Sequence, residues 1–235
     1  MATSAMLPSV GLALAIVLFH FTPPHLGLLY PFIDHGYVFV GVFFLISGYV
    51  LTYNYADRAA TLNKRDFWIA RVSRLYPVYL LVLVLSTRML LDEWAARPHA
   101  EFWQGLLLTP ILLQGWSPTL ATFWNTVAWT LSCEVVLYIA FPWLIRAPWP
   151  KSPRRLVLLL LSLWAIGMIP HSLYLLLNPD HLTGPVTRYS STQLIRFLKF
   201  TPIPYICTFL VGVTLGKLQL SLPLSARQRL SLAAA

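Results

Sequence analysis

Long apolar runs recur along the chain and constrain its fold more than any other feature. A helix of about 20 apolar residues spans the hydrocarbon core of a bilayer. Hydrophobic residues make up 57% of the sequence and charged residues only 11%, which is far from the composition of a soluble domain. We therefore expect an all-α fold, a polytopic bundle of transmembrane helices. The apolar runs lie at residues 7–21, 37–53, 75–91, 123–143, 155–177 and 204–220.

A shorter apolar segment, residues 102–116, is interrupted by Pro110. Proline lacks the backbone N–H that a continuous helix uses, so this segment is a poor candidate for a full crossing. We expect it to dip into the membrane and return, or to lie at the membrane surface. Counted with the longer runs, it gives a prediction of about six or seven membrane segments.

Basic residues gather between the apolar runs, at residues 58–74 and 146–155. The positive-inside rule places both stretches, and with them the N-terminus, in the cytoplasm. The chain is therefore predicted to be a multi-pass protein of the cell membrane, in contact with membrane lipid. The net charge of +9 does not indicate nucleic-acid binding, because no soluble module presents a basic face interleaved with aromatic residues.

Glu134 is a carboxylate inside the apolar run 123–143. An ionisable group within the membrane is costly unless it faces protein or water, so it marks a functional site by default. Hydroxyl groups on neighbouring turns of a helix, such as that of Tyr138, lie within reach of this carboxylate. The alternative is a structural carboxylate that ties two helices together.

His20 lies near the far end of the first apolar run, roughly 20 Å along a helix from Leu7. If residues 123–143 form one helix that starts at the outer surface, Glu134 lies roughly 15 Å inside from Trp124. The two side chains would then have similar depths, and we expect them to meet. A histidine paired with a carboxylate is a common form of general base. The alternative for His20 alone is an interfacial or capping residue.

Arg71 and Arg74 are three residues apart and share one face of a helix that leads into the third apolar run. Two neighbouring guanidinium groups suit a polyphosphate, although they also suit anionic lipid headgroups. Ser47 and Gly48 belong to a stripe of small residues that favours close helix packing. Cys133 and Cys207 lie in apolar runs without metal-ligand spacing, so we expect no metal site.

Five segments resemble the membrane acyltransferase-3 family, the integral-membrane O-acyltransferases, in their order and rough spacing. They are LALAIVLFHF, VGVFFLISGYVLT, FWIARVSRLYPVY, NTVAWTLSCEVVLYIAFP and FLVGVTLG. By this resemblance His20 corresponds to the essential histidine of the family, and Glu134 ends its aromatic-x-x-Ser-x-Glu signature. The other matching positions are Arg71 and Arg74 for acyl-CoA, the pair Ser47 and Gly48, and Trp129 and Ser132 of the signature.

The resemblance implies a transferase that moves an acetyl group across the bilayer. Acetyl-CoA would be the co-substrate, with no bound cofactor, and the acceptor would be a hydroxyl of a sugar or glycan, so that the product is an O-acetylated carbohydrate. Lys64 and Arg65 are expected to assist Arg71 and Arg74 with the phosphates of acyl-CoA. His20 would act as general base supported by Glu134, with Tyr138 and Ser132 as supporting hydrogen-bond groups.

The chain departs from the family in two ways. Ser9 stands where the family usually has an arginine, and fewer helices are predicted than the roughly ten that the family usually has. We expect residues 1–235 to form a single acyltransferase domain that is incomplete at its C-terminus. The alternatives are a truncated, inactive member of the family and a transporter or flippase-like protein, in which His20 and Glu134 would relay protons.

Overall fold

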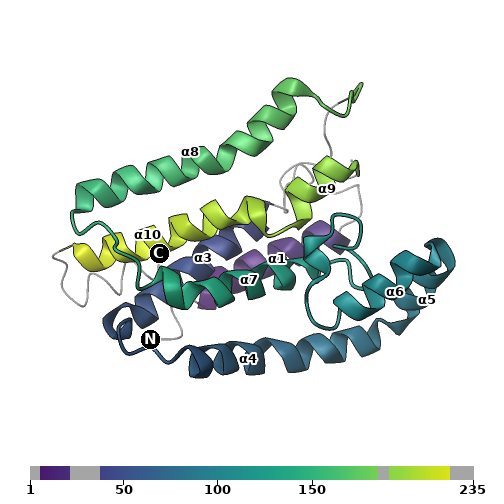
Figure 1. Cartoon of the computed structure of the whole chain (residues 1–235), viewed down its shortest axis with the longest axis horizontal. Coiled ribbons are helices and arrows are strands. Elements are labelled where there is room, and N and C mark those ends of the chain that lie inside the picture. Colours follow the sequence, from purple (N-terminus) through teal and green to yellow (C-terminus); the bar gives the residue numbers. More distant parts are fainter. Residues whose placement is uncertain (1–5, 22–37, 185–190, 223–235) are drawn as a thin grey trace. The chain divides into compact units, whose positions relative to one another are not determined.

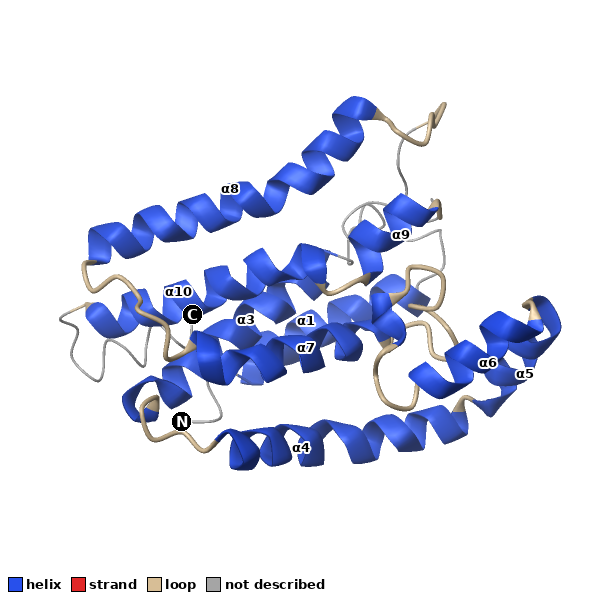
Figure 2. Cartoon of the chain, in the orientation of Figure 1, coloured by secondary structure: helices blue, strands red, loops and turns tan. Residues whose placement is uncertain are grey.

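The structure is a computed structural model that describes residues 6–21, 38–184 and 191–222. Within these ranges every regular element is a helix and no strand occurs (Figures 1 and 2). Four of these helices are long and apolar enough to cross a membrane, so the predicted helical membrane bundle is confirmed. They are α3 (Val38–Tyr55, followed by the 3₁₀ turn η2, Ala56–Arg58), α4 (Lys64–Leu85), α8 (Pro153–Leu177) and α10 (Ile206–Ser221, preceded by the 3₁₀ turn η4, Ile203–Tyr205).

Two further apolar helices are shorter, namely α1 (Met6–Phe21) and α7 (Trp129–Leu144). With α3, α4, α8 and α10 they account for the six long apolar runs. The remaining elements are short: α5 (Thr87–Ala96), α6 (His99–Leu108), the 3₁₀ turn η3 (Gln114–Trp116) and α9 (Gln193–Phe200).

The chain divides into two compact units. The first comprises Met1–Ala56, Pro148–Trp164 and Cys207–Ala235, and contains α1, α3, the first half of α8 and α10. The second comprises Asp57–Ala147 and Ala165–Ile206, and contains α4 to α7, the second half of α8 and α9.

In the first unit, helices α3 and α10 touch backbone to backbone. A methyl group on Gly48 would overlap the Phe209 carbonyl oxygen, and one on Gly212 would overlap the Leu45 carbonyl oxygen. Glycine is therefore needed at both positions for this close approach. A methyl group on Gly41, by contrast, would meet no described atom within 4 Å. The packing role predicted for Gly48 is confirmed, and Gly212 on α10 has the same role.

In the second unit, α4 begins at Lys64, well before the expected start of the third span at Leu75. The Asn63 side chain accepts a hydrogen bond of 3.0 Å from the Arg65 amide, which satisfies one of the exposed donors of the first turn. Asp66 adds a negative charge where the helix dipole is positive. Residues 64–74 of the basic stretch 58–74 are therefore the first part of this helix.

The segment predicted not to cross the membrane, residues 102–116, contains most of α6 and the turn η3. Helix α6 has 10 residues, which corresponds to about 15 Å along its axis, half of what a crossing needs. After Leu108 the chain turns at Thr109 and Pro110 instead of continuing as a helix. This agrees with the prediction for residues 102–116.

Helix α7 begins at Trp129, and the prediction of one helix from Phe123 to Trp143 was wrong. Trp124 adopts a left-handed backbone conformation with φ of 64°, which interrupts a helix. The Asn125 side chain then accepts a hydrogen bond of 3.1 Å from the Val127 amide, a turn that competes with helical bonding. Glu134 therefore lies in the second turn of α7, about 8 Å from its start rather than 15 Å.

Helix α9 is anchored at its first residue by a loop carboxylate. The Thr192 hydroxyl accepts a hydrogen bond from the Ile195 amide and donates one of 2.5 Å to Asp180, to which Tyr174 also donates at 2.7 Å. These two donors, Thr192 first, hold the pKa of Asp180 below its ordinary value. Asp180 thus connects the end of α8 to the start of α9.

Candidate active site

His20 occupies the last turn of α1 and its side chain is exposed. Its Nδ1 lies 2.8 Å from the carbonyl oxygen of Ile16, one turn earlier on the same helix. A carbonyl oxygen only accepts hydrogen bonds, so Nδ1 carries the proton of the neutral ring and Nε2 carries the lone pair. The Phe19 ring packs edge-on against the imidazole, with 5.0 Å between centroids. His20 therefore presents Nε2 as a base.

Glu134 is half-buried on α7 and accepts a hydrogen bond from the Tyr138 hydroxyl one turn later. The backbone carbonyl of Tyr138 accepts a second bond, of 3.2 Å, from Trp68 Nε1 on α4. Tyr138 therefore fixes one oxygen of the carboxylate and also ties α7 to α4. The Tyr138 hydroxyl therefore contacts Glu134, as the helical spacing predicted.

Trp129 and Ser132, the other signature residues, hold neighbouring segments. The Ser132 hydroxyl donates to the Leu112 carbonyl at 2.6 Å and accepts from the Gly115 amide at 3.1 Å. The Trp129 ring packs against Phe200. These contacts fasten the chain before and after α7, so Ser132 holds the preceding loop in place rather than contacting Glu134.

Ser47 and Gly48 lie in the middle of α3, in the first unit. Gly48 is buried against α10 as described above, and Ser47 is half-buried. His20 also belongs to the first unit, whereas Glu134 belongs to the second. The expected meeting of His20 with Glu134 stays a prediction.

The four basic residues predicted to bind acyl-CoA all lie on α4, but they do not share one face. At about 100° per residue, Arg71 points in nearly the same direction as Lys64, seven positions earlier. Arg65 and Arg74 are nine positions apart, which places them on opposite sides. Both are exposed, whereas Lys64 and Arg71 are half-buried.

Lys64 and Arg71 each lie over an aromatic ring. The Lys64 ammonium nitrogen is 4.2 Å from the centroid of Trp143 at the end of α7. The Arg71 guanidinium carbon is 5.6 Å from the centroid of Phe67. Such cation–π contacts hold a charge in place without neutralising it.

Arg146, which the sequence suggested only as a cytoplasmic charge, braces the loop before α4. Its guanidinium donates to the carbonyl oxygens of Ala59, Ala60 and Leu62 at 2.8, 3.4 and 2.7 Å. This loop leads directly into Lys64. No sequence pattern signals such a brace, because the acceptors are backbone carbonyls far away along the chain.

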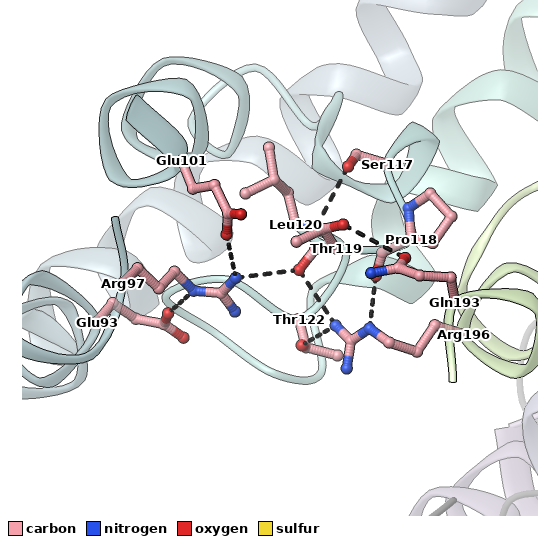
Figure 3. A network of polar contacts seen from close by, with 10 residues as sticks. All are labelled: Glu93, Arg97, Glu101, Ser117, Pro118, Thr119, Leu120, Thr122, Gln193 and Arg196. Carbon is pink, nitrogen blue, oxygen red and sulfur yellow. Dashed lines mark hydrogen bonds and ion pairs between the residues drawn. The ribbon is translucent and has the colours of Figure 1, made fainter. Parts of the chain in front are cut away.

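Two arginines far apart in the sequence, Arg97 at the end of α5 and Arg196 on α9, converge on the loop that precedes α7 (Figure 3). Arg97 and Arg196 donate to the same carbonyl oxygen, that of Thr119, at 3.3 and 3.2 Å. Arg97 is also paired with Glu93 and Glu101. Burial, and then the charge of Arg97, lowers the pKa of Arg196.

Arg196 makes two further contacts with the same loop. It donates to the Pro118 carbonyl at 2.7 Å and to the Thr122 hydroxyl at 2.9 Å. Together the two arginines bind residues 118, 119 and 122 of the loop that leads to α7. Sequence reasoning missed both of them, because charges near membrane ends are common and the carbonyl groups that join them are backbone atoms. The spacing of Arg97 from Glu93 and from Glu101, four residues each, is the one signal that the sequence offers.

Three buried polar atoms near the same loop have no hydrogen-bond partner among the described residues. They are Thr109 Oγ1, Gln114 Oε1 and Trp124 Nε1. Buried polar groups are usually paired, so we expect water to reach this part of the unit. Within the described ranges no group of three His, Cys, Asp or Glu side chains suits a metal ion.

Comparisons with known proteins give one family and one curated relative. The sequence profile described as "Acyltransferase domain" matches residues 10–235. The acyltransferase MdmB of Streptomyces mycarofaciens is 32% identical over 124 residues, which is 52% of this chain and 31% of the relative. The chain thus matches about a third of that relative's length. No solved structure matches the chain significantly.

Proposed function

Because the chain belongs to the acyltransferase-3 family, we propose that it is a membrane O-acyltransferase that moves an acetyl group from acetyl-CoA to a hydroxyl of a sugar or glycan. The observation that carries the proposal is the hydrogen bond between His20 Nδ1 and the Ile16 carbonyl, which leaves Nε2 to act as a base. A hydroxyl becomes a nucleophile towards a thioester only when a base removes its proton.

We propose that the protein lies in the cell membrane with residues 58–74 and 146–155 on the cytoplasmic side. Acetyl-CoA is an anion of the cytosol, and the start of α4 offers it Lys64, Arg65, Arg71 and Arg74. The phosphate oxygens of acetyl-CoA can form charge-assisted hydrogen bonds with these cations. The exposure of Arg65 and Arg74 supports their access to a ligand.

In the transfer step, His20 Nε2 takes the proton of the acceptor hydroxyl. The hydroxyl oxygen forms a bond with the thioester carbonyl carbon, and the carbon–sulfur bond breaks. The sulfur leaves with the bonding electrons as a thiolate and receives the proton back from the imidazolium. The products are an ester of the acceptor and free CoA, and such proton transfer typically contributes a rate gain of about 10²–10⁴.

Glu134 has two conceivable roles towards His20, namely orienting the neutral ring through Nδ1 and stabilising the imidazolium. Because Nδ1 is already hydrogen-bonded to the Ile16 carbonyl, it is not available to Glu134. This favours the second role, in which Glu134 stabilises the imidazolium. A carboxylate near a charged imidazole lowers the energy of the state in which the proton has moved. Tyr138 would keep the carboxylate in position.

The test is release of free CoA from acetyl-CoA by the purified chain in lipid nanodiscs, with and without a sugar acceptor. His20→Gln and Glu134→Gln should each lower the acceptor-dependent rate by roughly 100-fold or more. His171→Gln, on α8, serves as a matched control and should leave the rate unchanged. Acceptor-dependent CoA release that survives both His20→Gln and Glu134→Gln would refute the mechanism.

A further inference from the structure

The cytoplasmic end of the second unit carries an aromatic ring with a positive charge above it. Trp143 lies in the last turn of α7, and 50% of its surface is exposed. The ammonium group of Lys64, the first residue of α4, lies 4.2 Å from its ring centroid. The ring of Trp68 lies beside it at 5.7 Å, tilted by 38°. The half-exposed indole of Trp143 and the half-buried ammonium of Lys64 are therefore in contact.

Contacts on both sides hold this group of side chains in place. Trp68 Nε1 is bonded to the Tyr138 carbonyl at 3.2 Å, and the buried rings of Phe67 and Phe141 stack at 5.4 Å. Arg146 fixes the loop that ends at Lys64. The ends of α4 and α7 are thus joined, so the arrangement exists before any ligand binds, which lowers the entropic cost of binding.

Acyl-CoA offers two groups that match this arrangement. Its adenine is a flat aromatic base, and base–aromatic stacking is a common way for proteins to hold such a base. Its ribose carries a phosphate next to the base, and a lysine ammonium is a strong partner for phosphate.

We propose that Trp143 and Lys64 form the subsite for the adenosine 3′-phosphate part of acyl-CoA, with the base against the exposed part of Trp143 and the phosphate on Lys64. This inference rests on the proposed use of acyl-CoA as donor. The nucleotide and the pyrophosphate of acyl-CoA would then bind at two different positions along α4. Lys64 at its start receives the nucleotide, and Arg71 and Arg74, two to three turns further along, are left for the pyrophosphate.

The experiment measures the dissociation constants of CoA and of 4′-phosphopantetheine, which lacks the adenosine part, for the purified chain in lipid nanodiscs by calorimetry. Trp143→Ala should weaken CoA binding roughly tenfold, by loss of one stacked base. It should leave the dissociation constant of 4′-phosphopantetheine within about twofold, a difference of about 0.4 kcal/mol. Trp143→Phe keeps an aromatic ring and should restore most of the affinity for CoA.

Lys64→Gln provides the second arm, with dephospho-CoA as the probe, because this molecule lacks only the 3′-phosphate. The substitution should weaken CoA binding and leave dephospho-CoA binding nearly unchanged. Trp164→Ala is the matched control, since Trp164 lies on α8 with 60% of its surface exposed. It should change the binding of none of the three probes.

The outcomes separate this subsite from the proposed function. Equal weakening of CoA and 4′-phosphopantetheine by Trp143→Ala, or no weakening of either, overturns the subsite and is the result expected of a membrane anchor. Binding of CoA that depends on Trp143, without any acetyl transfer, upholds the subsite and refutes the enzyme. A chain that does not bind CoA at all refutes both.

Discussion

At the scale of single residues, the two proposed catalytic side chains each find a partner one helical turn away. His20 bonds to the Ile16 carbonyl and Glu134 to the Tyr138 hydroxyl. The second contact follows from helical spacing and was predicted. The first was not, because a backbone carbonyl within a helix is normally already bonded, and nothing in the sequence indicates that a side chain will share it.

Tyr138→Phe removes the hydroxyl donor to Glu134 and leaves the backbone carbonyl that Trp68 uses. We expect kcat to fall by about tenfold, because a hydrogen bond to a charged group contributes about 1.5–3 kcal/mol. KM for acetyl-CoA should stay unchanged, since this residue does not contact the donor. Steady-state kinetics in nanodiscs measures both constants.

The control is Tyr79→Phe, which deletes a hydroxyl bonded to the Thr109 carbonyl at 2.5 Å in the same unit. It should lower thermal stability without a specific loss of kcat. A rise in KM with constant kcat in the Tyr138→Phe variant would contradict the proposed support of Glu134.

At the scale of helices, the sequence predicts where the helices lie along the chain better than it predicts the residues at which they begin. The apolar runs at 37–53 and 204–220 became α3 and α10 within two residues at each end, because continuous hydrophobicity and small packing residues agree there. The start of α4 was missed because the apolar run begins only at residue 75, although Asn63 is a good cap. The start of α7 was missed because a left-handed Trp124 has no signature.

Gly212→Ala should destabilise the contact between α3 and α10. The added methyl overlaps the Leu45 carbonyl, and crowding of this kind costs about 1–3 kcal/mol. Gly41→Ala is the matched control on α3, where a methyl meets no described atom and a better helix former should be neutral or stabilise by up to about 1 kcal/mol. Thermal unfolding in detergent compares the two, and equal effects would refute the close packing.

Asp180→Asn should loosen the start of α9. The pKa of Asp180 is lowered from its ordinary 3.8 by Thr192 and Tyr174, so folding favours the ionised form. Its contribution is therefore present above about pH 3.8 and is lost as the pH falls through the folded-state pKa. At pH 7 the first amides of α9 should exchange hydrogen faster in the variant. A difference that persists undiminished at pH 2 would contradict this account.

At the scale of the whole molecule, composition alone predicted a helical membrane protein, and the structure confirms it. The candidate site was predictable only in part. The residues on α4 and α7 follow from motifs, whereas Arg146, Arg97 and Arg196 act on backbone carbonyls that carry no sequence information. The pairing of His20 with Glu134 and the single domain over residues 1–235 stay predictions.

The proposed orientation can be tested by labelling with a membrane-impermeant maleimide. In a chain with Cys133 and Cys207 replaced by alanine, His99→Cys should react in intact cells, because α5 and α6 follow the end of α4 that the proposed orientation places outside. Ser152→Cys lies in the second basic stretch and should react only after the membrane is permeabilised. The reverse pattern would place acyl-CoA binding by α4 on the wrong side and refute the proposed donor site.

The convergence of Arg97 and Arg196 on one oxygen of Thr119 also bears on biosynthesis. Arg196 is separated from Thr119 by 77 positions, so the ribosome must add the whole of α7 and α8 before the second arginine can arrive. Until then a single guanidinium holds this oxygen. The loop before α7 can therefore make its full set of contacts only after α9 has been synthesised.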